Sequence, residues 1–188
     1  MTGCSADQPD PSGIEGLQLV EVTEQSSTER HTTERGSDYL TTPPAGGRHW
    51  PANAPDVAPG VLGWLRCGVY TAPVPSEFAV HSQEHGAVWL TYRPGATPAD
   101  VTTFTGLAAR DPAYVLVSPF PGQPGAWTAS TWGAQLTVEA PDDPRLAEFV
   151  RVYAGGGQGG EKGADCVGGT LPDVAEAALA AAERKAAG

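Results

Sequence analysis

The sequence is poor in sulfur and in histidine, since its 188 residues include one methionine, three cysteines and four histidines. The single methionine, Met1, argues against a copper(I) carrier built on thioether ligands. No two cysteines form a C-x-x-C pair, so a paired-thiolate metal motif is absent from the sequence. No apolar run approaches the roughly 20 residues that a membrane-spanning helix needs, and we expect the mature chain to be soluble.

Positive charge is also scarce: 11 lysines and arginines stand against 22 aspartates and glutamates, for a net charge of -11. Nucleic acids and anionic membrane surfaces repel a polyanion, so we expect neither as a partner. Residues 155–169 are glycine-rich but lack the spacing and the Lys-Ser/Thr pair of a phosphate-binding loop, which excludes nucleotide binding. No Gly-x-Ser-x-Gly sequence supports serine catalysis. The acidic surface favours cations.

Glycine and proline are abundant, with 24 and 18 residues, and they predict many turns around a modest core. Hydrophobic patterning and boundary residues predict strands and helices along most of the chain. The predicted strands cover residues 17–22, 63–70, 87–92, 114–118, 127–131 and 135–139, and the predicted helices cover 76–85, 97–110, 144–154 and 171–188.

This order of elements predicts an α+β fold, in which a single small domain has a mixed sheet, two or three helices packed on it and long Pro/Gly-rich loops. We expect residues 1–15 to be a disordered tether, 16–170 the domain and 171–188 an alanine-rich C-terminal helix or tail. The prolines and glycines of residues 41–51 predict a shaped loop that presents His49 and Trp50, and the irregular run continues to residue 60.

Two of the four histidines, His81 and His85, are four residues apart with Glu84 between them. Positions i and i+4 share one face of a helix, so the two rings could bind one ion together. Gly86 then ends the predicted helix. The alternative for any one histidine is a surface position or a hydrogen-bonded place in the core. The pair with its carboxylate predicts half of a metal site.

Glu84 could serve this site as a ligand, as a group that orients a histidine ring, or as a catalytic base. The letters His81-x-x-Glu84-His85 also spell the inverted zinc-protease motif. That motif belongs in a long helix with a third ligand downstream. Here Gly86 ends the helix at once, and none of the downstream acids is a distinctive partner. We therefore place the protease interpretation below the others.

Of the three cysteines, one stands alone near the N-terminus and the other two form a candidate pair. Cys4 follows a glycine and precedes a polar tail, as in a bacterial lipoprotein, so we expect a lipid anchor at Cys4 as the only link to a membrane. Cys67 and Cys166 form an even pair that suits an extracytoplasmic disulfide. The alternatives are an ordinary N-terminus for the first and buried free thiols or metal ligands for the others.

Three short stretches, residues 43–49, 68–70 and 80–88, together resemble an uncharacterised, mostly actinobacterial family of secreted or membrane-tethered proteins, a domain of unknown function. The family pattern runs His-Val, Tyr, Pro-Pro-x-Ser-Gly-x-His, Gly-x-Tyr and His-x-Leu-Glu-His-Gly. The resemblance covers residues 30–153. This chain departs from the pattern at Gly46 and Gln83, which replace the family's serine and leucine. The insertion at residues 52–60 and the cysteine pair also lie outside it.

The resemblance implies one set of signature residues: His31, His49, His81, Glu84 and His85, with Tyr39 and Tyr70 alongside. Imidazole ligands suit copper and zinc better than calcium or magnesium, and copper comes first outside the cytoplasm. We therefore expect the four histidines to bind copper or, as the alternative, zinc.

Three functions remain open. The first is an extracytoplasmic metal-binding protein for storage, delivery or sensing. The second is a copper-dependent oxidase or oxygenase, with Glu84 in catalysis and a small-molecule substrate in an aromatic pocket. The residues proposed for that pocket are Trp50, Tyr39 and Tyr70, with Trp64 and Tyr92 as further candidates. The third is a metal-free structural or interaction domain, in which the histidines hydrogen-bond the Pro/Gly-rich loops.

Overall fold

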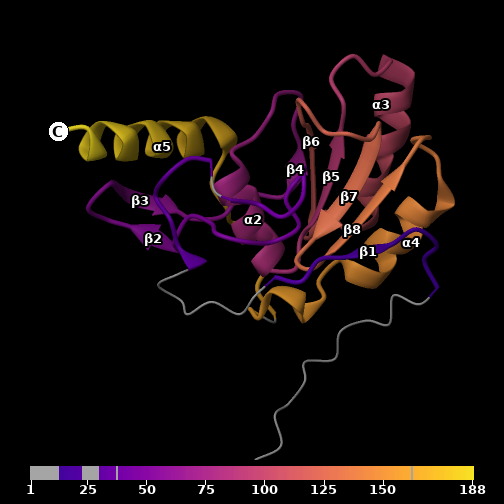
Figure 1. The fold of residues 1–188 in the computed structure, drawn as a ribbon, viewed down its shortest axis with the longest axis horizontal. Coiled ribbons are helices and arrows are strands. Elements are labelled where there is room, and N and C mark those ends of the chain that lie inside the picture. The colour runs from indigo at the N-terminus through magenta and orange to yellow at the C-terminus, as the bar shows by residue number, and fades with distance from the viewer. Residues whose placement is uncertain (1–12, 23–29, 37, 162) are drawn as a thin grey trace, which may run out of the picture.

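The computed structural model describes residues 13–22, 30–36, 38–161 and 163–188. Its centre is a mixed sheet with the strand order β1-β8-β7-β5-β6-β4 (Figure 1). The strands are β1 (Gln18–Leu19), β4 (Gly68–Val69), β5 (Val88–Tyr92), β6 (Val115–Pro119), β7 (Trp127–Thr131) and β8 (Ala134–Val138). β5 pairs parallel with β6 and antiparallel with β7, and β4 pairs parallel with β6. The predicted α+β class with a mixed sheet is confirmed.

Four helices accompany the sheet in the described residues: α2 (Ser76–Glu84), α3 (Pro98–Thr105), α4 (Pro144–Tyr153) and α5 (Pro172–Ala186). Two of the helices have side-chain N-caps: Thr97 and Asp143 accept hydrogen bonds from backbone N–H groups in the first turns of α3 and α4. The helix predicted to run to Arg110 changes character on the way: α3 ends at Thr105 and a 3-10 segment, η1 (Gly106–Arg110), continues it.

The central strands β5, β6 and β7 are buried on both faces, so β5 is mostly apolar and does not alternate with polar residues. Val88 and Leu90 point to the face covered by α3 and α4, whereas Trp89 points to the opposite face. There Trp89 meets Phe78 of α2 and Leu179 of α5 in a second core. α2 therefore lies between the sheet and the loops that precede it in the chain.

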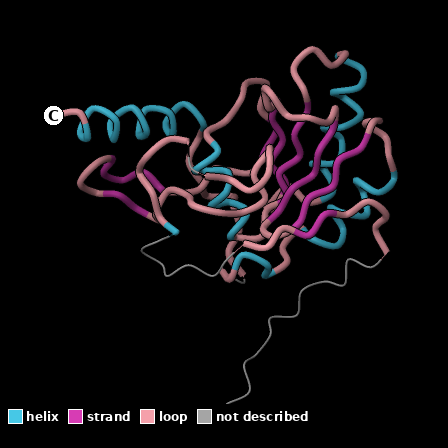
Figure 2. Tube along the Cα trace, in the orientation of Figure 1, coloured by secondary structure: helices cyan, strands magenta, loops and turns pink. Residues whose placement is uncertain are grey.

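The region after Pro51 differs from the prediction, which was an irregular run up to residue 60. Asn53–Ala54 (β2) and Ala58–Leu62 (β3) form a two-stranded antiparallel hairpin. α5 lies beside this hairpin, at the side of the sheet (Figures 1 and 2). The hairpin escapes the sequence because its strands are short, irregular in register and largely exposed, so no alternating pattern marks them.

The expected bridge between Cys67 and Cys166 is present and joins segments 99 positions apart in the chain. A disulfide indicates an oxidising environment. Cys4 lies outside the described residues, as does most of the expected tether. Among the described residues, no helix combines the length and the apolar character needed to cross a membrane.

Candidate metal centre

The candidate site lies at the C-terminal end of α2, where the chain turns into β5. His81 and Glu84 belong to the last turns of the helix, and His85 is its C-cap. Gly86 has φ of 91°, a left-handed conformation that ends the helix and that glycine adopts without strain. The three candidate residues before it are almost fully buried, with exposed fractions of 1% for His81, 2% for Glu84 and 6% for His85.

The other two histidines come from the loops in front of α2. His31 and His49 form an isolated parallel bridge, in which Thr32 N–H donates to the carbonyl of His49 and His49 N–H donates to that of Arg30, both at 2.8 Å. The histidine rings then follow one another across the site. Their centroids are 5.1 Å apart for His31 and His49, 4.8 Å for His49 and His81, and 4.9 Å for His81 and His85.

Three of these rings share one feature: Nδ1 faces a backbone carbonyl oxygen. The distances are 2.9 Å from His49 to Gly47, 2.6 Å from His81 to Trp50 and 3.1 Å from His85 to Asp165. A carbonyl oxygen only accepts, so Nδ1 must carry the proton in each neutral ring. Nε2 is then the unprotonated nitrogen, which is the atom that binds metals when Nδ1 is held in this way.

The Nε2 atoms of His49 and His81 are buried without a hydrogen-bond partner. Glu84 Oε2 lies 3.0 Å from the first and 3.9 Å from the second. Two acceptor atoms at 3.0 Å repel each other unless positive charge, from a second proton or a metal ion, lies at the contact. Bonds of 2.0–2.1 Å to a tetrahedral ion place neighbouring ligand atoms about 3.3 Å apart, and the 3.0 Å between His49 and Glu84 is close to that separation.

Glu84 is held in its charged form by its neighbours. Burial alone would raise the pKa of Glu84, but His49, His81 and Arg30 together outweigh it and lower the pKa. Arg30 Nη1 donates to Oε1 at 2.8 Å, which leaves Oε2 facing the histidines. Of the three roles expected for Glu84, this geometry fits a metal ligand directly.

The donor atoms fall into two sets that could each hold a metal ion. Within each set, the atoms lie within 4.8 Å of one another. The first set is His31, His49 and Glu84, and the second is His81, His85 and Glu161. Each contains two imidazoles and one carboxylate, a combination found in zinc and non-haem iron sites.

Glu161 is the member that the sequence did not single out. Its Oε2 lies 3.0 Å from Nε2 of His85, and its side chain is 51% exposed. Nothing in the sequence distinguishes it from other surface acids, because it reaches the site through long-range packing. At Gly159 an added Cβ would lie 2.2 Å from the backbone of Glu84, so only glycine allows the loop that carries Glu161 to lie this close to α2.

The aromatic residues proposed for a pocket lie in different places. Trp50 is fully buried against Phe78 and contributes its carbonyl to His81. Tyr39 packs near Gly47, whereas the Tyr70 hydroxyl donates to the carbonyl of Arg66.

Two other tryptophans, one of them the further candidate Trp64, have rings next to the histidines. Trp64 lies 4.7 Å from His85 and 5.6 Å from His81, and Trp132 lies 5.7 Å from His49. Their fluorescence can therefore report on the site.

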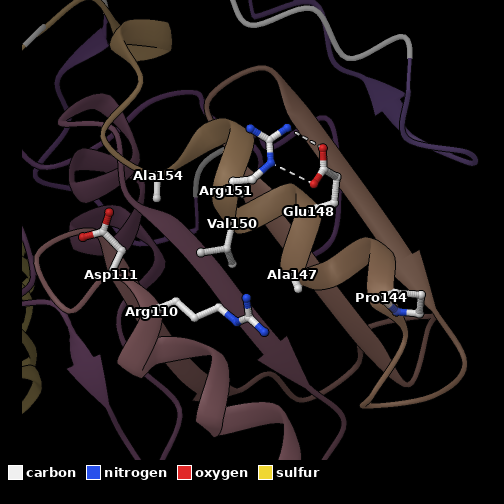
Figure 3. A pocket seen from close by; sticks show the side chains of 8 residues that line it. All are labelled: Arg110, Asp111, Pro144, Ala147, Glu148, Val150, Arg151 and Ala154. Carbon is white, nitrogen blue, oxygen red and sulfur yellow. Dashed lines mark hydrogen bonds and ion pairs between the residues drawn. The ribbon is translucent and has the colours of Figure 1, made fainter.

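A hollow of about 400 Å³ lies elsewhere, between η1 and α4 (Figure 3). Arg110, Glu148 and Arg151 all border this hollow. In the view of Figure 3, Arg110 lies below α4, and the ion pair of Arg151 with Glu148 lies above it. α4 covers the sheet face opposite α2, and no histidine lines this hollow. It is separate from the histidine cluster.

The cluster makes the metal-free protein sensitive to acid. Burial, with the neighbouring His49 and His85, lowers the pKa of His81 to about 3, although its bond to Trp50 and the charge of Glu84 oppose the shift. The unfolded chain binds this proton near pH 6.5 and the folded chain does not, so stability falls as the pH drops from about 6.5 towards 3. We expect a loss of about 2 kcal/mol between pH 7 and pH 5.

Urea denaturation of metal-free protein at the two pH values measures this loss. His81→Asn removes the titrating ring, so the stability of that variant should depend less on pH over the same interval. Equal slopes for the two proteins would contradict the assignment to His81.

Comparison with known proteins gives one match. A family model described as "Protein of unknown function (DUF3105)" matches residues 31–168. No curated protein and no solved structure matches the chain. The matched region contains all four histidines, Glu84, Glu161 and both cysteines of the disulfide.

Proposed function

This chain belongs to the DUF3105 family of proteins of unknown function, and we propose that it is an extracytoplasmic metal-binding protein that holds a divalent transition metal ion at His31, His49 and Glu84. The observation that carries the proposal is the buried Nε2 atom of His49, which has no hydrogen-bond partner and lies 3.0 Å from the ionised carboxylate of Glu84. Copper(II) is the first candidate for the ion, and zinc is the second.

A purely structural role explains the contacts of only one of the two nitrogens in each ring. The bonds from Nδ1 to loop carbonyls are those that a scaffold needs, and they hold the loops around Gly47 and Trp50. They leave Nε2 of His49 without a hydrogen-bond partner, with only the carboxylate of Glu84 beside it, and a buried polar group without a hydrogen bond costs about 1–3 kcal/mol. A metal ion at Nε2 of His49 offsets that cost, and Glu84 supplies negative charge for the ion.

The donor set favours copper(II) or zinc. Calcium and magnesium prefer more oxygen ligands, whereas two imidazoles and one carboxylate suit borderline ions. Cys67 and Cys166 are held in the disulfide, so neither thiolate competes for the ion. Copper(II) has the highest affinity for nitrogen and oxygen sites in the divalent series, and the oxidising compartment indicated by the disulfide keeps copper in that state. A lipid anchor at Cys4 would then retain the protein at the cell envelope.

A copper-dependent oxidoreductase is the second candidate function. One observation favours it: three protein ligands leave coordination positions open, as catalytic sites do. The more exposed member of the first set is His31, so a small molecule would approach from its side. Storage, delivery or sensing stays the first proposal because the other two donors, His49 and Glu84, are almost fully buried.

Metal analysis by mass spectrometry, after equilibrium dialysis against copper(II) or zinc(II), tests the proposal. Wild-type protein should retain at least one ion per chain, and His49→Ala should lose the ion of the first set. The matched control is Glu148→Gln, on the exposed side of α4, which should bind like wild type. Copper(II) should also quench the fluorescence of Trp64 and Trp132.

No retained ion in wild-type protein with either metal would overturn the proposal. Oxygen uptake by the copper-loaded protein, measured with an added reducing substrate, separates the two functions, because an oxidoreductase turns over the substrate and a carrier does not. Sustained turnover that His49→Ala abolishes would favour the oxidoreductase.

A further inference from the structure

We propose that the centre holds two metal ions, the second at His81, His85 and Glu161, with Glu84 at the junction of the two sets. The inference rests on the proposed function for the first ion. It is carried by the geometry of the second set, whose donor atoms, like those of the first, all lie within 4.8 Å of one another.

The second set is built like the first. His81 and His85 both direct Nδ1 to a backbone carbonyl, which leaves both Nε2 atoms as donors. Nε2 of His81 is buried and unpaired, and Nε2 of His85 lies 3.0 Å from Glu161 Oε2. One ligand from α2, one from its C-cap and one from a loop thus lie within 4.8 Å of one another.

Glu84 joins the two sets. Its Oε2 lies 3.0 Å from Nε2 of His49, in the first set, and 3.9 Å from Nε2 of His81, in the second. Arg30 occupies Oε1, so the same carboxylate oxygen faces both. The two adjacent rings have centroids only 4.8 Å apart. This spacing suits a pair of ions held about 3.5–4 Å apart, as in two-metal enzymes.

Charge sets the order of binding. Two divalent ions add four positive charges, and Arg30 adds one, against one negative charge each from Glu84 and Glu161. The second ion therefore binds more weakly than the first, and a hydroxide or another anionic oxygen from solution completes the pair. Exposed Glu161 places the second set at the solvent side. An oxygen anion is thus the ligand class that a two-ion centre would accept.

Calorimetric titration with zinc(II), checked by metal analysis, tests the inference. Wild-type protein should bind two ions per chain with different affinities. Glu161→Gln should weaken only the second by about 100-fold, and because the side chain is half-exposed the variant should fold normally. Glu148→Gln is again the matched control, since it also removes one exposed carboxylate with a nearby base. Its two affinities should match those of wild type.

Each outcome decides between the proposals. One ion in wild-type protein, retained by Glu161→Gln and lost in His49→Ala, would overturn the second site and leave the proposed function standing. Two ions with affinities unchanged in Glu161→Gln would also overturn it. No ion in wild-type protein would sink both proposals. With copper(II), spin coupling between the two ions should reduce the integrated electron spin resonance signal below two spins per chain, whereas distant ions would give the full signal.

Discussion

Replacing Cys67 and Cys166 together by alanine is expected to lower the free energy of unfolding by about 4–5 kcal/mol. The bridge closes a loop of 99 positions, and a loop of that length restricts the unfolded chain strongly. The two segments also contact each other through a backbone bond, from Cys67 N–H to the carbonyl of Cys166 at 3.1 Å. Guanidinium denaturation at neutral pH measures the difference.

Reduction of the wild-type protein provides the control for this prediction. Reduced wild type and the double variant should unfold at similar denaturant concentrations, because both lack the same constraint on the unfolded chain. A loss smaller than about 1 kcal/mol would contradict the chain-entropy argument.

The disulfide also bears on the second set of metal ligands. Cys166 follows Asp165, whose carbonyl holds Nδ1 of His85, and the same loop carries Glu161. The first set depends on residues 30–50 and on α2, none of which the bridge touches directly. In the double variant, the affinity for the second ion should therefore fall more than the affinity for the first. Titration with zinc(II) can compare the two affinities.

Local signals explain what the sequence predicted well. α2 ends where Gly86 takes a left-handed conformation, and α3 and α4 begin at Thr97 and Asp143 with a proline at the next position. These boundaries depend on single residues and on backbone preferences, so they can be read without tertiary structure. The close placement of the histidines on α2 followed in the same way from the i, i+4 spacing.

Long-range contacts explain what the sequence did not predict. The bonds at Nδ1 go to main-chain carbonyls of Gly47, Trp50 and Asp165, and any residue type could supply a carbonyl there. Glu161 reaches His85 only because Gly159 lets its loop pack on α2. The division of the donors into two sets depends on these contacts, so no spacing pattern in the sequence could have revealed it.

Glu84→Gln is expected to reduce the affinity for the first ion by at least about 100-fold, since it removes the only anionic donor of that set and substitutions around metal ligands already cost 10–100-fold. The amide keeps the shape of the carboxylate and retains an oxygen for Arg30. Titration with copper(II) or zinc(II), monitored by the fluorescence of Trp64 and Trp132, measures the change. Unaltered affinity would rule out Glu84 as a ligand.

The stability of the same variant separates a metal site from a scaffold. In the metal-free protein the amide nitrogen of Glu84→Gln can donate to Nε2 of His49 or His81, the two buried atoms that have no partner. A carboxylate cannot do this, so the natural residue sacrifices a hydrogen bond that a neutral amide would make. We therefore expect the free energy of unfolding of the metal-free variant to fall by less than about 1 kcal/mol or to rise. If the cluster instead held the loops together through an ion pair between protonated His49 and Glu84, the amide would lose that pair and the variant would unfold far more easily.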